Sequence, residues 1–440
     1  MGVREERTVT GRLIMSTDVR VDTESSTADK PVNAKVFVKK RRGPILGAIF
    51  LMATSAIGPG FITQTATFTA QFQAAFGFAI LVSIVIDFAV QMNVWRIIVV
   101  SGKRAGELAN SAFPGSGYVL AVLIIIGGLA FNIGNIAGGG LGINAMLGID
   151  AKIGGAVTGL IAIGIFLWKK AGPIMDAFLV FLGVLMIGLM IYVAFASQPP
   201  LGEALKQTVL PDTISWATIT TIVGGTVGGY ITYSGAHRFL DSGEAGPDNV
   251  KSVHRASANG IFVTGIMRYV LFLAILGVAA SGFVIDTTSK TANPAAQAFY
   301  HVLGFAGLRI FGVILWAAAI SSVIGAAYTS SSFLSVFSQK LKSGTNLRIA
   351  TVIFIVISLA CFLVWGAAPA SILVFVGGLN GLILPIGLTI FMYIGWFRSH
   401  DLLHGYKYPI WLLIFGTAAT VLTWYMAIVS IKPIFGFIAG

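Results

Sequence analysis

The residues that could do chemistry gather where two apolar segments carry residues that disfavour a helix. The first reads AIGPGFITQ, residues 56–64, and the second reads TTIVGGTVGGYITYSG, residues 220–235. An interrupted helix leaves backbone carbonyls unpaired, and at membrane depth these must face a cavity, water or a ligand. Neutral side chains beside the interruptions, Gln64, Thr226 and Tyr230, could bind a small solute or ion together with those carbonyls.

The composition is that of an integral membrane protein. Hydrophobic residues make up 56% of the 440 residues, charged residues only 10%, and the mean hydropathy is +0.87. The net charge of +12 comes from short Lys and Arg clusters between apolar runs, which set orientation in a bilayer. We therefore expect the lipid bilayer as the partner, with no nucleic acid and no obligate protein partner. No hydrolase or metalloprotease motif is present, so we expect no enzyme and no cofactor.

Eleven runs are long and apolar enough to be candidate membrane-spanning helices. They lie at residues 44–66, 73–97, 116–142, 151–168, 173–196, 215–236, 258–282, 303–336, 348–366, 371–396 and 409–431. When these spans alternate in direction, most Lys and Arg residues of the connections fall on one side, which predicts a cytoplasmic N-terminus and an external C-terminus. The sequence thus predicts a multi-pass protein of the cell membrane.

The order of the spans predicts an inverted repeat. Spans 1 and 6 cross in opposite directions, and both are interrupted, which is typical of secondary transporters with a substrate site near the midplane. The expected organisation is a disordered cytoplasmic tail (1–38), a first repeat with spans 1–5 (39–200), a second repeat with spans 6–10 (201–400), and span 11 with the C-terminus (401–440). The fold class is therefore all-α, with residues 58–60 and 225–229 expected to be non-helical.

Several motifs resemble the Nramp family of divalent metal transporters, which has a LeuT-type inverted repeat. The first-span family motif D-P-G-N falls on Gly58-Pro59-Gly60-Phe61, with Gln91 matched to the family's glutamine in span 2. The span-6 pattern G-A-T-V-M-P-H falls on residues 224–230. Further agreement lies in SGKRAGELA after span 2, in FASQPPLGEALKQTVLP between spans 5 and 6, and in SSVIGAAYTSSS of span 8. The resemblance covers nearly everything from residue 43 onward.

The departures from this family point to a different ion. The family's metal-binding Asp, Asn and Met, and its span-6 histidines that serve proton movement, are replaced here by Gly58, Phe61, Gly228, Tyr230 and Gly235. A transition-metal site needs imidazole, carboxylate or soft sulfur, whereas Mg²⁺ prefers oxygen ligands and commonly keeps several waters. The wider, less charged pocket resembles the Nramp-related magnesium transporter branch. This resemblance implies alternating-access transport of partly hydrated Mg²⁺, or Mn²⁺, without proton coupling.

Two further groups of residues complete the expected site. Asp87 in span 2 and Arg268 in span 7 lie at similar depth on repeat-related spans, which predicts a structural ion pair. Asn380 in span 10 could be a neutral ligand or could form a hydrogen bond between helices. The expected substrate or metal site consists of Gly58, Phe61, Gln64, Gly225, Thr226, Gly228, Tyr230 and Asn380, with helix breaks at Gly58, Pro59, Gly60, Gly228 and Gly229.

Two other functions remain open at this stage. Without a carboxylate at the breaks, exposed helix N-termini would favour negative charge, so a LeuT-type carrier of an anion or a small neutral solute is one alternative. A membrane sensor or partner protein that transports nothing is the other. The short connections, with no added soluble domain, count against the second alternative.

Overall fold

The computed structural model describes residues 58–167, 171–241, 243–289, 291–341, 344–365 and 369–439, all of which belong to one compact unit, residues 42–440. These residues form helices and connections, with no strand among them. The tail predicted for residues 1–38 and the first part of span 1 lie outside the described residues.

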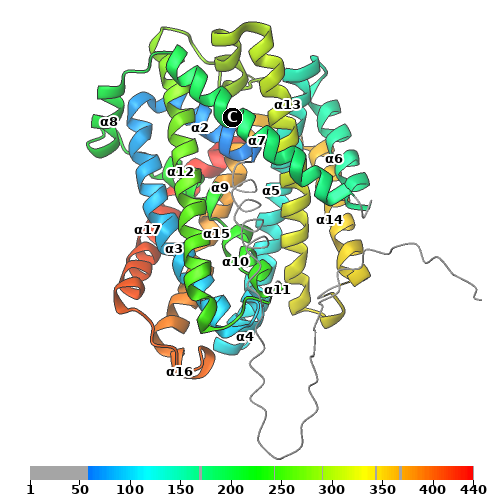
Figure 1. The fold of residues 1–440 in the computed structure, drawn as a ribbon, viewed down its shortest axis with the longest axis vertical. Helices are drawn as coiled ribbons and strands as arrows, with labels where there is room; N and C mark the ends of the chain where they lie inside the picture. The colour runs from blue at the N-terminus through cyan, green and yellow to red at the C-terminus, as the bar shows by residue number, and fades with distance from the viewer. Residues whose placement is uncertain are drawn as a thin grey trace, which may run out of the picture. The chain divides into compact units, whose positions relative to one another are not determined.

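Predicted spans 2 to 11 overlap apolar helices, whereas of the first span only residues 58–66 lie in the described part of the chain (Figure 1). These helices are α2 (Pro59–Phe72), α3 (Phe76–Ser101), α5 (Ser116–Leu147), α6 (Ala151–Leu167), α7 (Ala171–Ala196), α9 (Trp216–Thr226), α10 (Tyr230–Gly235), α12 (Val250–Ala280), α13 (Pro294–Ser332), α14 (Gly344–Val364), α15 (Pro369–Phe397) and α17 (Ile410–Ala439). Within the described residues, seven helices are long and apolar enough to cross a membrane, or eight if the bent pair α7 and α8 is one span. The chain is therefore an all-helical membrane protein, and the count of eleven spans stays a prediction.

Short helices cap the two ends of the bundle. In Figure 1, α4 (Ala105–Ala112), α11 (His237–Asp241) and α16 (Ser399–Leu402) lie at the lower end, and α8 (Leu201–Val209) lies at the upper end. The basic residues Lys103, Arg104 and Arg398 sit beside the helices of the lower end. The positive-inside rule would make that end cytoplasmic, and the orientation of the termini stays a prediction.

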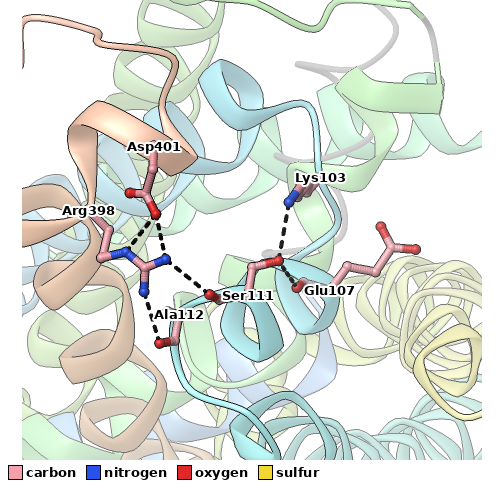
Figure 2. Close-up of polar contacts among 6 residues, drawn as sticks. All are labelled: Lys103, Glu107, Ser111, Ala112, Arg398 and Asp401. Atoms are coloured by element: carbon pink, nitrogen blue, oxygen red, sulfur yellow. Dashed lines mark hydrogen bonds and ion pairs between the residues drawn. The ribbon is translucent and has the colours of Figure 1, made fainter.

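A polar network joins α4 to the connection between α15 and α16 (Figure 2). The Arg398 guanidinium donates to Asp401 and also to the backbone carbonyls of Ala112, at 3.1 Å, and Ser111, at 3.4 Å. The Ser111 hydroxyl is in turn contacted by Lys103, whose Nζ lies 3.2 Å from Oγ. Because Arg398 binds the last carbonyls of α4, which have no partners within that helix, it both caps α4 and ties it to α15.

Glycines allow the central helices to pack closely. A methyl carbon placed on Gly142 of α5 would lie 2.6 Å from the backbone nitrogen of Trp316 in α13, and one placed on Gly224 of α9 would lie 2.0 Å from the carbonyl oxygen of Gly377 in α15. Small residues at such contacts let helix backbones approach each other, as is common between membrane helices. The helix α2 contacts α5, α9, α12, α13 and α15, so its first turn lies at the centre of this packing.

Candidate substrate site

The first predicted break falls at the start of α2, and the residues before Gly58 lie outside the described part of the chain. Gly58 is the N-cap, with extended dihedral angles (φ −87°, ψ −178°), and the helix begins at Pro59. The prediction that Pro59 and Gly60 interrupt the helix is therefore wrong, because both are helical. Proline is well tolerated in the first turn of a helix, where its missing N–H would have no partner within the helix. No side chain caps this N-terminus.

The second break separates α9 from α10. Helical geometry ends at Thr226, and Val227, Gly228 and Gly229 connect it to Tyr230, the first residue of α10. Gly229 has a φ of +53°, a conformation that glycine adopts without strain. Gly225 and Thr226, which we expected to be non-helical, are the last two residues of α9, so the break is shorter than the sequence predicts.

Gly228 does not open space for a ligand. A methyl carbon at this position would lie 2.2 Å from the carbonyl oxygen of Gly224, so the tight exit from α9 itself excludes a side chain. The expected gain of pocket volume at Gly228 is therefore not seen. A methionine introduced here would disturb the backbone before it could offer its sulfur to an ion.

Gln64 occupies the space between α9 and α15. Its Nε2 donates to the Leu373 carbonyl of α15 at 2.9 Å, and a methyl carbon on Gly225 or Gly377 would meet its amide at 2.5 Å or 2.3 Å. The side chain is fully buried, and its Oε1 has no hydrogen-bond partner among the described residues. A buried carbonyl oxygen without a donor is costly, so Oε1 is an available acceptor for a ligand.

Asn380 places a second free oxygen beside the break in α9 and α10. Its Nδ2 donates to the carbonyls of Gly127 in α5 and Val376, both at 3.0 Å, which is the hydrogen bond between helices that the sequence left open. Its Oδ1 has no partner in the described part of the chain, and a methyl carbon on Gly229 would lie 2.3 Å from it. Asn380 is thus both a structural donor and a free acceptor at the break.

Unpartnered polar groups also lie beneath the N-terminus of α2. A methyl carbon on Gly58 would lie 2.7 Å from Ser322 Oγ in α13 and 3.7 Å from Asn135 Oδ1 in α5. These two oxygens and Asn135 Nδ2 are buried and lack hydrogen-bond partners in the described structure. The break at Gly58 therefore faces polar side chains from two helices that the sequence did not connect with it.

The guanidinium group of Arg268 lies over the ring of Phe61. The guanidinium carbon of Arg268 in α12 lies 4.3 Å from the centroid of the Phe61 ring, a favourable cation–π distance. Arg268 is 2% exposed, donates one weak hydrogen bond to the Ile222 carbonyl at 3.4 Å, and leaves Nε and one terminal nitrogen without hydrogen-bond partners. Phe61 therefore packs against a buried positive charge beside the first turn of α2.

The direct ion pair predicted between Asp87 and Arg268 is absent. Asp87 Oδ1 accepts instead from the Thr226 hydroxyl at 3.3 Å, and no hydrogen bond or ion pair within 4 Å joins it to Arg268. The two charges are close enough to attract each other, but Arg268 points to Phe61 and Ile222. Their partners on α9, Ile222 for Arg268 and Thr226 for Asp87, stand one turn apart.

The site lacks the ligands of a preformed transition-metal centre. Among the described residues, no group of three or more His, Cys, Asp or Glu side chains could hold a metal ion. The available acceptors are amide and hydroxyl oxygens, which suit hard cations and their water ligands. The structure thus places Gln64 against Gly225 and Asn380 against Gly229, and Thr226 contacts Asp87.

Comparison with known proteins agrees with this architecture. A membrane protein of Haemophilus influenzae, itself described as uncharacterized, is 48% identical over 403 residues, which cover 92% of this chain and 98% of that protein. A manganese transporter of Eremococcus coleocola has a similar fold, with a TM-score of 0.69, 16% identity, and coverage of 89% and 86% of the two chains. Mhp1, a nucleobase-cation-symport-1 family transporter with bromovinylhydantoin bound, gives a TM-score of 0.58, 15% identity, and coverage of 90% and 93%.

The described helices define an all-helical membrane protein with a non-helical connection between α9 and α10. A family model described as natural resistance-associated macrophage protein-like matches residues 49–432. The chain belongs to this family, Nramp, whose members have no cofactor and carry metal ions as substrates.

Proposed function

We propose that this protein is a secondary carrier that moves a divalent cation, Mg²⁺ ahead of Mn²⁺, across the cell membrane by alternating access. The observation that carries the proposal is the pair of buried, unpartnered carbonyl oxygens, Gln64 Oε1 and Asn380 Oδ1, which face Gly225 and Gly229 on the two sides of the break. Family membership favours a metal ion as the cargo. With neutral oxygens as its protein ligands, the ion keeps much of its water, as Mg²⁺ does readily.

Replacement of Gln64 by glutamate should strengthen cation binding. The new carboxylate would stand where Oε1 now faces Gly225, and the added negative charge should lower the apparent Kd for Mg²⁺ at least about tenfold, which is about 1.4 kcal/mol. The measurement is the Mg²⁺ dependence of thermal stability in detergent, together with Mg²⁺ uptake into proteoliposomes.

Two variants control this experiment. Gln71→Glu makes the same change on an exposed residue of the same helix and should leave the affinity unchanged. Gln64→Leu removes the hydrogen bond to Leu373 without adding charge, and should weaken cation binding. If Gln64→Glu and Gln64→Leu alter the Mg²⁺ dependence in the same direction, Gln64 does not face the ion.

Transport should leave the lumenal pH unchanged. We propose that no proton moves with the cation, because Tyr230 and Gly235 stand where the family carries histidines. A pH-sensitive dye enclosed in the proteoliposomes should therefore report no acidification during Mg²⁺ uptake, with a proton ionophore as the positive control. Acidification that follows the Mg²⁺ gradient would contradict the proposal.

A second candidate function is transport of a small anion, such as a carboxylate. Two observations favour it: the N-terminus of α2 has no side-chain cap, and Arg268 keeps two buried guanidinium nitrogens unpartnered beside the first turn of that helix. Helix N-termini and free guanidinium groups both bind carboxylates. Gln64→Glu separates the two functions, because it should weaken an anion's stabilising effect and strengthen that of Mg²⁺.

A further inference from the structure

A small cavity adjoins the break, and neither Gln64 nor Asn380 lines it. It has a volume of about 30 Å³ and is bordered by α3, α12 and the α9–α10 connection. Its polar lining consists of Asp87 and Gln91 from α3, Thr226 from α9 and Thr264 from α12. One water needs about 10 to 15 Å³ by this measure, so the cavity holds about two particles of that size.

Asp87 shares its hydrogen-bond donor with another acceptor. Its side chain is 5% exposed, and the only hydrogen bond it accepts within the described residues comes from Thr226, at 3.3 Å. The same hydroxyl lies 2.9 Å from the Ile222 carbonyl, and a hydroxyl has a single hydrogen to donate. The carboxylate is therefore poorly satisfied, although a buried charge requires pairing or full hydrogen bonding.

Gln91 supplies a second free group in the same cavity. It stands one helical turn beyond Asp87 on α3, so both side chains lie on the same face. Gln91 is 7% exposed and forms no side-chain hydrogen bond within the described residues. A carboxylate and a free amide oxygen, four residues apart and aimed into a cavity for about two waters, are the ligands expected for a small cation.

We propose that this cavity binds one small alkali cation, sodium, between Asp87 and Gln91. A fully hydrated dication carries about six waters and does not fit, whereas a sodium ion with one water does. Thr226, which donates to Asp87, is the last helical residue before the break. A sodium ion on Asp87 frees the Thr226 hydroxyl for Ile222 and so links ion occupancy to the conformation of the break.

Sodium binding can be tested without any transported substrate. The full-length protein in detergent is titrated with NaCl at constant ionic strength, with N-methyl-D-glucamine chloride as the balancing salt and no divalent cation present. We expect a saturable, sodium-specific rise in Tm and saturable binding of radioactive sodium. Because the readout is binding alone, failure of the proposed substrate would not affect it.

Three variants decide the location of the ion. Asp87→Asn should abolish the sodium response, Gln91→Leu should weaken the apparent affinity at least about tenfold, and Asp286→Asn, in an exposed connection, should leave it unchanged. Gln91→Leu retains both buried charges and so serves if Asp87→Asn does not fold. A sodium response that survives Gln91→Leu at full affinity, the absence of any sodium-specific response in the wild type, or stabilisation that follows pH alone would each overturn the proposal.

Discussion

Replacement of Gly224 by alanine is expected to cause a loss of stability of about 3 kcal/mol, at the upper end of the usual range for overpacking a buried site. The added methyl carbon would lie 2.0 Å from the Gly377 carbonyl oxygen and 2.3 Å from the Gly381 nitrogen of α15. These are backbone atoms of a helix, which cannot move aside as the end of a flexible side chain can. The helices α9 and α15 would have to separate, and Gly225 and Gly377, against which Gln64 packs, would move with them.

The measurement is the Tm and the monodisperse yield of the purified variant in detergent. Gly188→Ala in α7 is the matched control, because a methyl carbon there meets nothing within 4 Å and alanine favours a helix. Gly225→Ala should fall between the two, since its methyl carbon would meet the amide end of Gln64, a side chain that can turn. Equal stability of Gly224→Ala and Gly188→Ala would show that α9 and α15 pack less closely than in this structure.

Replacement of either Asp87 or Arg268 by a neutral residue should also be strongly destabilising. Either single replacement, Asp87→Asn or Arg268→Met, leaves one charge deep in the bundle, and a lone charge at the centre of a membrane helix costs roughly 2.5 to 3.5 kcal/mol on insertion scales. The double variant should recover part of that loss, because neither charge remains. The recovery should be about 1 to 2 kcal/mol, within the range for residues that share a polar network, since no hydrogen bond joins the pair directly.

A double-mutant cycle on Tm, or on denaturant midpoints, measures this coupling. Leu271→Ala, a buried apolar truncation in α12, indicates what a loss of packing without a change of charge does. It should lower stability by the same amount in the wild type and in Asp87→Asn. Strict additivity of Asp87→Asn and Arg268→Met would show that the two charges do not sense each other across Ile222 and Thr226.

The helices could be predicted from the sequence because turn-forming and polar residues mark where the apolar runs begin and end. The span at 116–142 follows the Phe113–Gly115 turn and is observed as α5 from Ser116, and the span at 151–168 is observed as α6 from Ala151. The failures concern proline and glycine. The pattern predicts a helix break at Pro59, which instead starts α2, and one at Gly225, which is helical and whose missing side chain leaves room for Gln64.

The site was less predictable, because its contacts join residues that are distant in the chain. Sequence proximity to the breaks points to Gln64 and Thr226, and isolated polarity in an apolar run points to Asn380 and Asp87; all four are buried in the structure, and their role as ligands stays a prediction. Nothing in the sequence indicates that Arg268 turns to Phe61 rather than to Asp87. That choice depends on side-chain directions set by the packing of α12 on α2 and α9, which periodicity does not specify.

The single amide of Gln64 has a kinetic consequence. Its Nε2 donates a hydrogen bond to the Leu373 carbonyl and so links α2 to α15, while its Oε1 has no hydrogen-bond partner among the described residues. Because the amide is planar, a ligand that draws Oε1 toward itself would also rotate Nε2 and weaken its hydrogen bond to the Leu373 carbonyl. Under the proposed function, the empty carrier would keep the hydrogen bond between α2 and α15, and the loaded carrier would lose it. Exchange of bound solute across the membrane should therefore be faster than net uptake. Only net uptake requires the empty protein, in which α2 is still hydrogen-bonded to α15, to reorient.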